Sequence, residues 1–199
     1  MNDYHLMEAK FIKFLNFLSP QEHQNMVEWV LKHEQKFELS KSSSSQDNYR
    51  RSLVMLLTPE AEILIAQRIT PVVHLAMEKL SVSGLNLDKI EAQITAHNDG
   101  NYYKTHNDNG MPPLDQRELT YVYYFYREPK AFSGGELVLY DEKKEGDRSL
   151  KADSFKLIEP TNNSIIFFHS RHWHQVLPVS CPSGSFADSR FTINGWVWR

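Results

Sequence analysis

The sequence has one cysteine, no long hydrophobic run and little excess charge of either sign. Cys181 has no second cysteine with which to form an internal disulfide. No apolar run approaches the roughly 20 residues that a membrane-spanning helix needs, so a membrane span is not expected. The net charge is -3, with both signs interspersed. It gives no reason to expect the concentrated basic face of a nucleic-acid-binding protein.

Compartment and domain number are the next properties that composition restricts. The first residues, MNDYHLMEAKF, lack the positive and apolar regions of a secretory signal. With a single cysteine, this makes the reducing cytoplasm the expected location. A chain of 199 residues with 41% hydrophobic residues suits one globular domain with a sizeable core. Composition gives no indication of the oligomeric state.

The first 89 residues are predicted to form an N-terminal helical support. The sequence SPQE, residues 19–22, matches a capping box with proline at the first helical position, and we expect a helix to about Phe37. A second helix is expected over residues 59–80, because apolar residues recur there along one stripe. The segment FIKFLNFL, residues 11–18, fits either an edge strand or the start of a helix, and we favour the strand.

Residues 90–199 are predicted to form a β-rich core. Short segments of β-branched and aromatic residues alternate there with turn sequences that contain Gly, Pro, Asn or Asp. The sequence DEKKEGD is interpreted as one such turn, a solvated hairpin. The expected strands are residues 90–95, 119–126, 136–140, 164–168, 172–179 and 191–198. This spacing indicates an antiparallel sandwich or barrel, so the expected fold class is mainly β with flanking helices (α+β).

A histidine and a carboxylate, His106 and Asp108, follow two tyrosines in YYKTHNDNG. Residues i and i+2 of a strand face the same way, so this pair would present both groups to one point. Alone, such a pair also arises by chance on solvated loops. A third ligand is available from FFHSRHWHQV, where strand parity places His172 and His174 on one face and does not choose between them. Two histidines and one carboxylate form the facial set of non-haem iron(II) sites.

Five segments together resemble the iron(II)- and 2-oxoglutarate-dependent dioxygenases, most closely their prolyl 4-hydroxylase-like branch. They occur in the family's order and are GNYYKTHND (100–108), RELTYVYYFY (117–126), SGGELVLYD (133–141), FFHSRHWHQVLPV (167–179) and SRFTINGWVW (189–198). The resemblance covers roughly residues 90–199. It implies a double-stranded β-helix, a jelly-roll of two facing sheets with the metal at one mouth, which agrees with the strand count.

The resemblance also implies site residues. The catalytic iron ligands that it implies are His106, Asp108 and His174. It implies that the far carboxylate of 2-oxoglutarate is bound by one basic and two hydroxyl side chains, Arg190, Tyr124 and Thr192. An arginine suits this role because a buried carboxylate without a partner would cost several kcal/mol, and the guanidinium fork matches it.

Other residues of these segments receive weaker assignments or depart from the family. His172 is kept as a supporting or pocket residue, and His169 is expected to be structural. His97 stands where the branch often has tyrosine, and CPSGSFADS lengthens the interval before Arg190. The Gly134-Gly135 pair matches the family, and a bulge or a tight strand entry also explains it. For Tyr121, Tyr123 and Tyr126 we favour cross-strand packing, and Trp196 resembles an aromatic residue behind the pocket.

The resemblance implies hydroxylation of an unactivated C–H bond with Fe(II), 2-oxoglutarate and O2. The coproducts of this reaction are succinate and CO2, and ascorbate is a possible further cofactor of the family. The favoured substrate is a prolyl residue in a peptide or protein, and a free amino acid or small natural product is the alternative. A non-catalytic jelly-roll that binds a metal or small acid has no need of both the ligand set and Arg190. A zinc hydrolase lacks an evident general base. The serine-rich residues 39–51 fit either a lid or a solvated linker that ends in two surface arginines.

Overall fold

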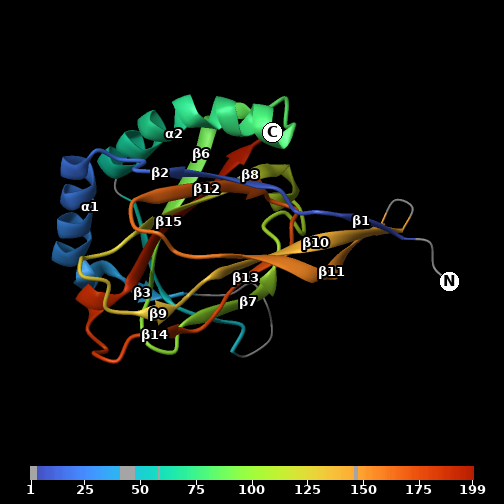
Figure 1. The fold of residues 1–199 in the computed structure, drawn as a ribbon. Helices are drawn as coiled ribbons and strands as arrows, with labels where there is room; N and C mark the ends of the chain where they lie inside the picture. The colour runs from blue at the N-terminus through green and yellow to red at the C-terminus, as the bar shows by residue number, and fades with distance from the viewer. Residues whose placement is uncertain (1–3, 41–47, 58, 146–147) are drawn as a thin grey trace.

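The computed structural model describes residues 4–40, 48–57, 59–145 and 148–199, which form a jelly-roll of two facing antiparallel sheets (Figure 1). The outer face of the larger sheet is covered by two helices, α1 (Pro20–Lys32) and α2 (Pro59–Leu80). The prediction of a mainly β protein with flanking helices is confirmed. The end of the predicted lid, at residues 48–51, is described, but residues 41–47 lie outside the described part of the chain.

The larger sheet contains seven strands, and its centre is built from segments far apart in the sequence. In spatial order these are β2 (Phe11–Leu15), β12 (Ser164–His169), β8 (Arg117–Phe125), β15 (Arg190–Trp198), β6 (Asn86–His97), β5 (Leu53–Leu56) and β3 (Glu38–Leu39). The strand predicted at FIKFL is thus confirmed as β2. The predicted boundary between residues 89 and 90 falls inside β6, and strands from the first 89 residues join both sheets.

The smaller sheet faces the larger one and carries most of the site. Its spatial order is β1 (His5–Met7), β10 (Leu137–Glu145), β13 (His174–Val176), β7 (Tyr102–His106) and β4 (Arg50–Arg51), and β11 (Arg148–Ile158) also pairs with β10. A separate two-stranded ribbon joins β14 (Val179–Ser180) to β9 (Ser133–Gly134). Short 3-10 turns occur at η1 (Glu34–Lys36), η2 (Leu114–Gln116) and η3 (Phe186–Asp188).

Helix α1 begins as the sequence predicts and ends earlier. The Ser19 hydroxyl accepts a hydrogen bond from the Glu22 backbone N–H at 3.3 Å, and the Glu22 carboxylate accepts one from the Ser19 N–H at 3.0 Å. This is the predicted capping box. The predicted end at Phe37 is wrong, because His33 leaves helical geometry. There its ring Nδ1 donates to the Trp29 carbonyl at 2.7 Å, which satisfies a carbonyl of the last turn.

The main core lies between the helices and the larger sheet. Apolar residues from α1 and α2 pack there on strands β6, β8, β12 and β15; they include Val30, Ile69, Val73, Tyr121, Ile193 and Phe167, all fully or almost fully buried. Each such side chain contributes about 1.5–3 kcal/mol to folding. The helices therefore cover the outer face of the larger sheet, and a second apolar cluster and the site share the space between the inner faces of the two sheets.

Two predicted elements are corrected by the structure. The expected strand at 172–179 is divided into β13 and β14, because Pro178 between them has no N–H for a ladder hydrogen bond. Residues 141–145 of the turn predicted at DEKKEGD continue strand β10, and residues 146–147 lie outside the described residues. The strand persists because its first two carboxylates are buried and paired: Asp141 accepts from the Ala9 N–H at 2.8 Å and Glu142 contacts His172.

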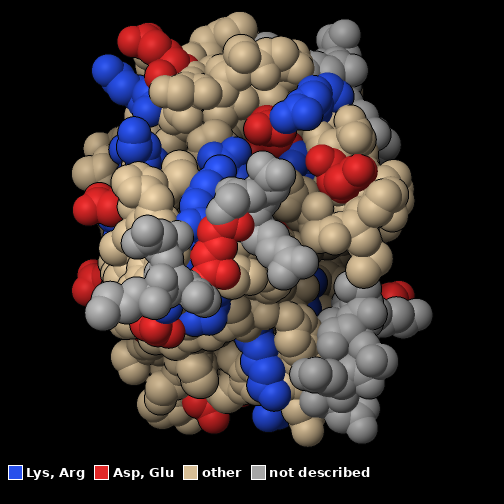
Figure 2. All heavy atoms as spheres, turned by 90° about the vertical axis from the view of Figure 1, so that its right-hand side faces the viewer, with Lys and Arg blue, Asp and Glu red and all other residues tan. Residues whose placement is uncertain are grey.

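The exterior of the protein carries charges of both signs. On the face in Figure 2, the right-hand side of Figure 1, basic and acidic side chains are interspersed. The surface charge of that face therefore does not by itself point to a polyanionic or polycationic partner. Within the described ranges, neither α-helix combines the length and the apolar character needed to cross a bilayer.

Candidate active site

A cavity of about 290 Å³ lies between the two sheets. Strands β4, β7 and β13 of the smaller sheet and β6, β8 and β15 of the larger sheet contribute side chains to its wall. Its polar and charged lining includes Arg50, His97, His106, Asp108, Arg117, His174 and Arg190. Most of the sequence-predicted site residues thus line this one cavity.

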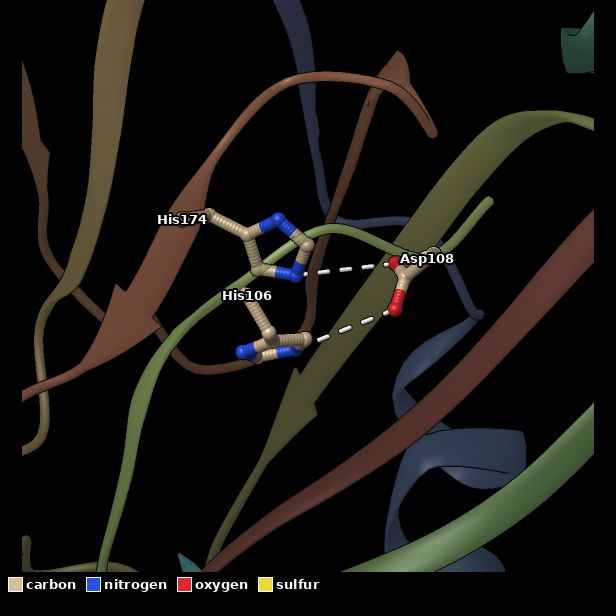
Figure 3. Close-up of side chains that lie close together, drawn as sticks. All are labelled: His106, Asp108 and His174. Atoms are coloured by element: carbon tan, nitrogen blue, oxygen red, sulfur yellow. Dashed lines mark ion pairs between the residues drawn. The ribbon is translucent and has the colours of Figure 1, made fainter. Parts of the chain in front are cut away.

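His106, Asp108 and His174 converge at one end of this cavity (Figure 3). Strands β7 and β13 pair with His106 directly opposite His174, so the two imidazoles lie side by side with ring centroids 4.2 Å apart. The Asp108 oxygens lie 3.8 Å from His106 Nε2 and 3.5 Å from His174 Nε2. One donor atom from each residue lies within 4.8 Å of the other two, a spacing that a single metal ion can bridge.

The reason for this convergence differs from the one predicted. Strand β7 ends at His106, so Asp108 lies in the following loop and strand parity does not orient it. The loop is fixed instead by two contacts: the Asp108 N–H donates to the Ser170 carbonyl at 2.9 Å, and the Thr120 hydroxyl donates to the Asp108 carboxylate at 2.7 Å. The partners that aim this carboxylate therefore come from β8 and from the turn after β12.

Both histidines are held with Nε2 facing the carboxylate. His106 Nδ1 donates to the Lys104 carbonyl at 2.8 Å, and His174 Nδ1 donates to the His172 carbonyl at 2.9 Å. With the proton on Nδ1, the Nε2 lone pair of each ring is available to a metal. Burial lowers the pKa of His106 to about 3, so this ring is neutral near pH 7.

The carboxylate of the cluster is ionised. Burial would raise the pKa of Asp108, but His174, His106 and the hydrogen bond from Thr120 outweigh it and hold the pKa below its ordinary value. Two imidazoles and one carboxylate match the donor set of a non-haem iron(II) site, with coordination positions left open for other ligands.

Arg190 forms a second polar centre in the cavity. It is the first residue of β15, pairs in register with His97 of β6 and is 1% exposed. Its guanidinium lies 5.0 Å from the centroid of the Tyr124 ring, and its NH1 lies 3.4 Å from His97 Nδ1. Among the described residues, Arg190 Nε and the Thr192 hydroxyl have no hydrogen-bond partner. A buried cation with unused donors fits a small carboxylate ligand.

The neighbours of Arg190 are uncharged. Burial raises the pKa of Tyr124 to about 12, so its phenol keeps its proton. The pKa of His97 is well below its ordinary value because of burial and the nearby Arg190 and Arg50. A neutral His97 can accept a hydrogen bond from the guanidinium. The residue that departs from the family pattern therefore contacts the arginine that the resemblance assigned to the cosubstrate.

The glycine pair has a function beyond a tight strand entry. Gly135 has φ +72°, and a Cβ there would lie 2.6 Å from Arg190 Cδ and 2.8 Å from Val179 Cγ2. A Cβ at Gly134 would lie 2.3 Å from the Pro178 carbonyl oxygen. Gly134 thus allows the close approach of β9 and β14, and Gly135 leaves the space that the Arg190 side chain occupies.

The histidines outside the cluster have other partners. His172 Nδ1 lies 2.5 Å from Glu142 Oε1, and the Ser149 hydroxyl donates to the other Glu142 oxygen at 2.6 Å. Burial would raise the pKa of Glu142, but these two contacts lower it to about 2. His169 Nε2 donates to the Leu80 carbonyl at 3.1 Å, a structural contact between β12 and the end of α2.

Sequence reasoning missed two arginines of the cavity. Arg117 lies 3.6 Å above the centroid of the Trp196 ring and donates to Glu91 at 2.7 Å. Its position in RELTYVYYFY was the available signal. Arg50 was considered only as part of a lid or as a surface arginine, and the structure turns it inward, with Arg51 facing out. A two-residue strand that alternates inside and outside gives too short a pattern to detect.

Comparison with known proteins agrees with this geometry. Residues 92–198 match the model of the 2OG-Fe(II) oxygenase superfamily. The chain belongs to this family. Its cofactors are iron(II), 2-oxoglutarate and O2, and the three clustered donors and the buried arginine fit them. The family resemblance of the five sequence segments is thus confirmed.

Among individual proteins, the chain is 45% identical over 184 residues to an uncharacterized PKHD-type hydroxylase of Synechocystis sp. PCC 6803. The match covers 92% of this chain and 61% of that protein, so the chain spans about three fifths of the relative's length. A prolyl-4-hydroxylase of Pseudomonas putida has the same fold, with a TM-score of 0.69, 18% identity, and coverage of 96% and 93% of the two chains.

A Trichoplax adhaerens prolyl hydroxylase, solved with a peptide of hypoxia inducible factor, has a TM-score of 0.68 and 20% identity. The match covers 94% of this chain and 83% of that one. These structures confirm the jelly-roll fold.

Proposed function

We propose that the protein is a 2-oxoglutarate-dependent dioxygenase that hydroxylates an unactivated C–H bond, with a prolyl residue of a peptide or protein as the substrate. The observation that carries this proposal is the convergence of two imidazoles and one carboxylate within 4.8 Å, in a cavity that also holds a buried arginine. A zinc hydrolase would leave that arginine without a role, and a simple metal-binding protein would need only the three ligands.

The proposal gives each polar centre a separate ligand. His106, Asp108 and His174 bind iron(II) through Nε2, a carboxylate oxygen and Nε2. The Arg190 fork binds the far carboxylate of 2-oxoglutarate, and the hydroxyls of Tyr124 and Thr192 add donors to it. When bound, iron with 2-oxoglutarate and O2 supplies the oxidising chemistry, with succinate and CO2 as coproducts.

The remaining residues around these centres position them. Thr120 holds the Asp108 carboxylate in the direction of both imidazoles. His97, neutral beside Arg190, fixes the guanidinium without competing for the negative ligand. Because these groups are buried, the protein contributes orientation and exclusion of water, which strengthens every charge interaction in the cavity.

The choice of a prolyl substrate is supported by the 45% identity with a PKHD-type hydroxylase and by the fold shared with prolyl hydroxylases. A free amino acid or a small natural product is the alternative substrate. We also propose a cytoplasmic location and ascorbate as a further cofactor. Residues 1–89 are proposed to support a catalytic core of residues 90–199.

An anaerobic titration tests the proposal directly. Adding iron(II) and then 2-oxoglutarate to the protein should give the visible charge-transfer band of the chelate, and admitting air should give succinate. Asp108→Ala should lose both signals, because it removes the one carboxylate among the three clustered side chains. His74→Ala, which changes an exposed histidine on α2, is the matched control and should keep both. Full succinate formation by Asp108→Ala would refute the ligand assignment.

A further inference from the structure

Arg50 is another inward-facing cation of the cavity. It lies on the smaller sheet, which faces the larger sheet that carries Arg190. It belongs to β4 at the edge of the smaller sheet, where it pairs with Tyr103 of β7. Its guanidinium lies 4.8 Å from the centroid of the Tyr103 ring, and that ring stacks on His106 with centroids 3.6 Å apart. The cation is therefore separated from a proposed iron ligand by a single aromatic ring.

The hydrogen bonds of Arg50 do not use up its donors. Nε donates to the Ser52 hydroxyl at 2.9 Å, and NH2 contacts the Thr95 hydroxyl at 3.4 Å. A guanidinium has five N–H donors, so three have no partner among the described residues. Within the described ranges no carboxylate lies at ion-pair distance from Arg50, and the Asp108 carboxylate of the cavity is already engaged by Thr120 and the two histidines.

A charge count shows what this arginine is free to bind. Iron(II) brings two positive charges and Asp108 removes one. 2-Oxoglutarate brings two negative charges and Arg190 one positive charge, so these four groups sum to zero. Arg117 is neutralised by Glu91. Among the described residues of the cavity, Arg50 is left as one uncompensated positive charge.

We propose that Arg50 binds a carboxylate of the substrate and so selects substrates with an acidic group close to the oxidised carbon. This inference deepens the proposed function and rests on it. The carboxylate can belong to a free amino acid, to the C-terminus of a peptide or to an acidic side chain beside the target residue. Arg50 lines the same cavity of about 290 Å³ as the three proposed iron ligands, so the acid and the reacting carbon are expected to be close neighbours.

Pairs of probes that differ by one charge test this inference. The three pairs are L-proline with L-prolinamide, a proline-ending peptide with its C-terminal amide, and a Glu-Pro peptide with the matching Gln-Pro peptide. One readout is the stimulation of succinate formation above the rate without substrate. The other is the rise in unfolding temperature of the anaerobic protein on adding each probe, which needs no turnover.

In at least one pair the acid should exceed its amide by about ten- to one-hundred-fold in kcat/KM, the range of a charge-assisted hydrogen bond, and should give the larger thermal shift. The responsive pair identifies the source of the carboxylate. Arg50→Gln should remove the preference, and Arg50→Lys should keep part of it because the charge remains. Arg51→Gln, the outward-facing neighbour, is the matched control and should keep the preference in full.

Several results would overturn the inference. Equal stimulation by acids and amides, or no response to any acid while succinate is still formed without substrate, would show that no carboxylate is selected. A preference that persists in Arg50→Gln would place the carboxylate elsewhere. An Arg50→Gln effect confined to the affinity for 2-oxoglutarate would assign Arg50 to the cosubstrate. Absence of all succinate formation would instead contradict the proposed function, and the thermal shifts would still report on Arg50.

Discussion

The backbone carbonyl of His172 accepts the Nδ1 proton of His174 at 2.9 Å, while the His172 side chain is held by Glu142. A buried carboxylate on β10 thus fixes the turn whose backbone sets the tautomer and direction of the His174 ring. Glu142 is in turn fixed by the Ser149 hydroxyl of β11. The hairpin that composition suggested to be a solvated turn therefore supports the proposed iron site.

Glu142→Gln should weaken metal binding by up to about ten-fold, the lower end of the loss seen when a direct partner of a metal ligand is removed, because Glu142 acts on His174 through His172. The amide keeps the shape but loses the charge that pairs with His172. Titration with Mn(II) or Fe(II) under nitrogen measures the change. Glu145→Gln, on the same strand and without this contact, is the control. Unchanged affinity in Glu142→Gln would mean that the turn is held without this pair.

Arg190→Lys should raise the Kd for 2-oxoglutarate by about ten-fold or more, because lysine keeps the charge and loses the planar pair of donors. Iron affinity should change little, since Arg190 is not among the three clustered donors. The charge-transfer band, followed as 2-oxoglutarate is added to the iron-loaded protein, gives the affinity. Wild-type 2-oxoglutarate affinity in this variant would place the far carboxylate away from Arg190.

Gly135→Ala should reduce both stability and 2-oxoglutarate affinity. The positive φ costs alanine about 1 kcal/mol, and its Cβ would also press on Arg190 Cδ from 2.6 Å. Gly84→Ala separates the two effects, because Gly84 has the same φ of +72° and no atom within 4 Å of an added Cβ. Urea unfolding should show a loss in both variants, larger in Gly135→Ala. A loss of 2-oxoglutarate affinity is expected only in Gly135→Ala, and its appearance in both would exclude local crowding.

The stability of the protein should fall on acidification partly through His169. Burial lowers its pKa from 6.5 to about 4, so between these values the unfolded chain binds the proton and the folded chain does not. The free energy of unfolding therefore decreases as the pH falls through this window. His169→Gln keeps a donor for the Leu80 carbonyl and removes the titration.

Urea unfolding at pH 7 and pH 5 measures the His169 contribution. The variant should lose less stability than the wild type over this interval, by on the order of 1 kcal/mol. His74→Gln, on the exposed face of α2, should behave as the wild type. Equal losses in the wild type and His169→Gln would mean that His169 takes up its proton as readily in the folded protein as in the unfolded chain.

The sequence allowed prediction of those features that depend on local patterns or on a quoted motif. The capping box at Ser19, helix α2 and the central strands β8, β12 and β15 follow from spacing and side-chain type. The meeting of residues 106, 108 and 174 followed from the family resemblance, although strand parity was the wrong physical reason for the orientation of Asp108.

Features that depend on contacts between distant segments were not predictable. The charge-rich start of DEKKEGD continues a strand because Ala9 and His172 supply partners for its carboxylates, and both lie far away in the sequence. Arg50 turns inward because β4 pairs with β7, and a strand of two residues carries no periodicity. In each case a polar residue is buried because of a partner that lies far from it in the sequence.

Strand β15 lies between β8 and β6, although the three segments occur in the chain in the order β6, β8, β15. The two earlier strands therefore do not pair with each other. The edge of each that pairs with β15 stays unpaired until β15 inserts between them. Such non-local closure slows folding and leaves backbone edges open to intermolecular pairing. Closure of the larger sheet therefore depends on β15, and a substitution that delays its insertion should reduce the recovery of folded protein from the synthesised chain.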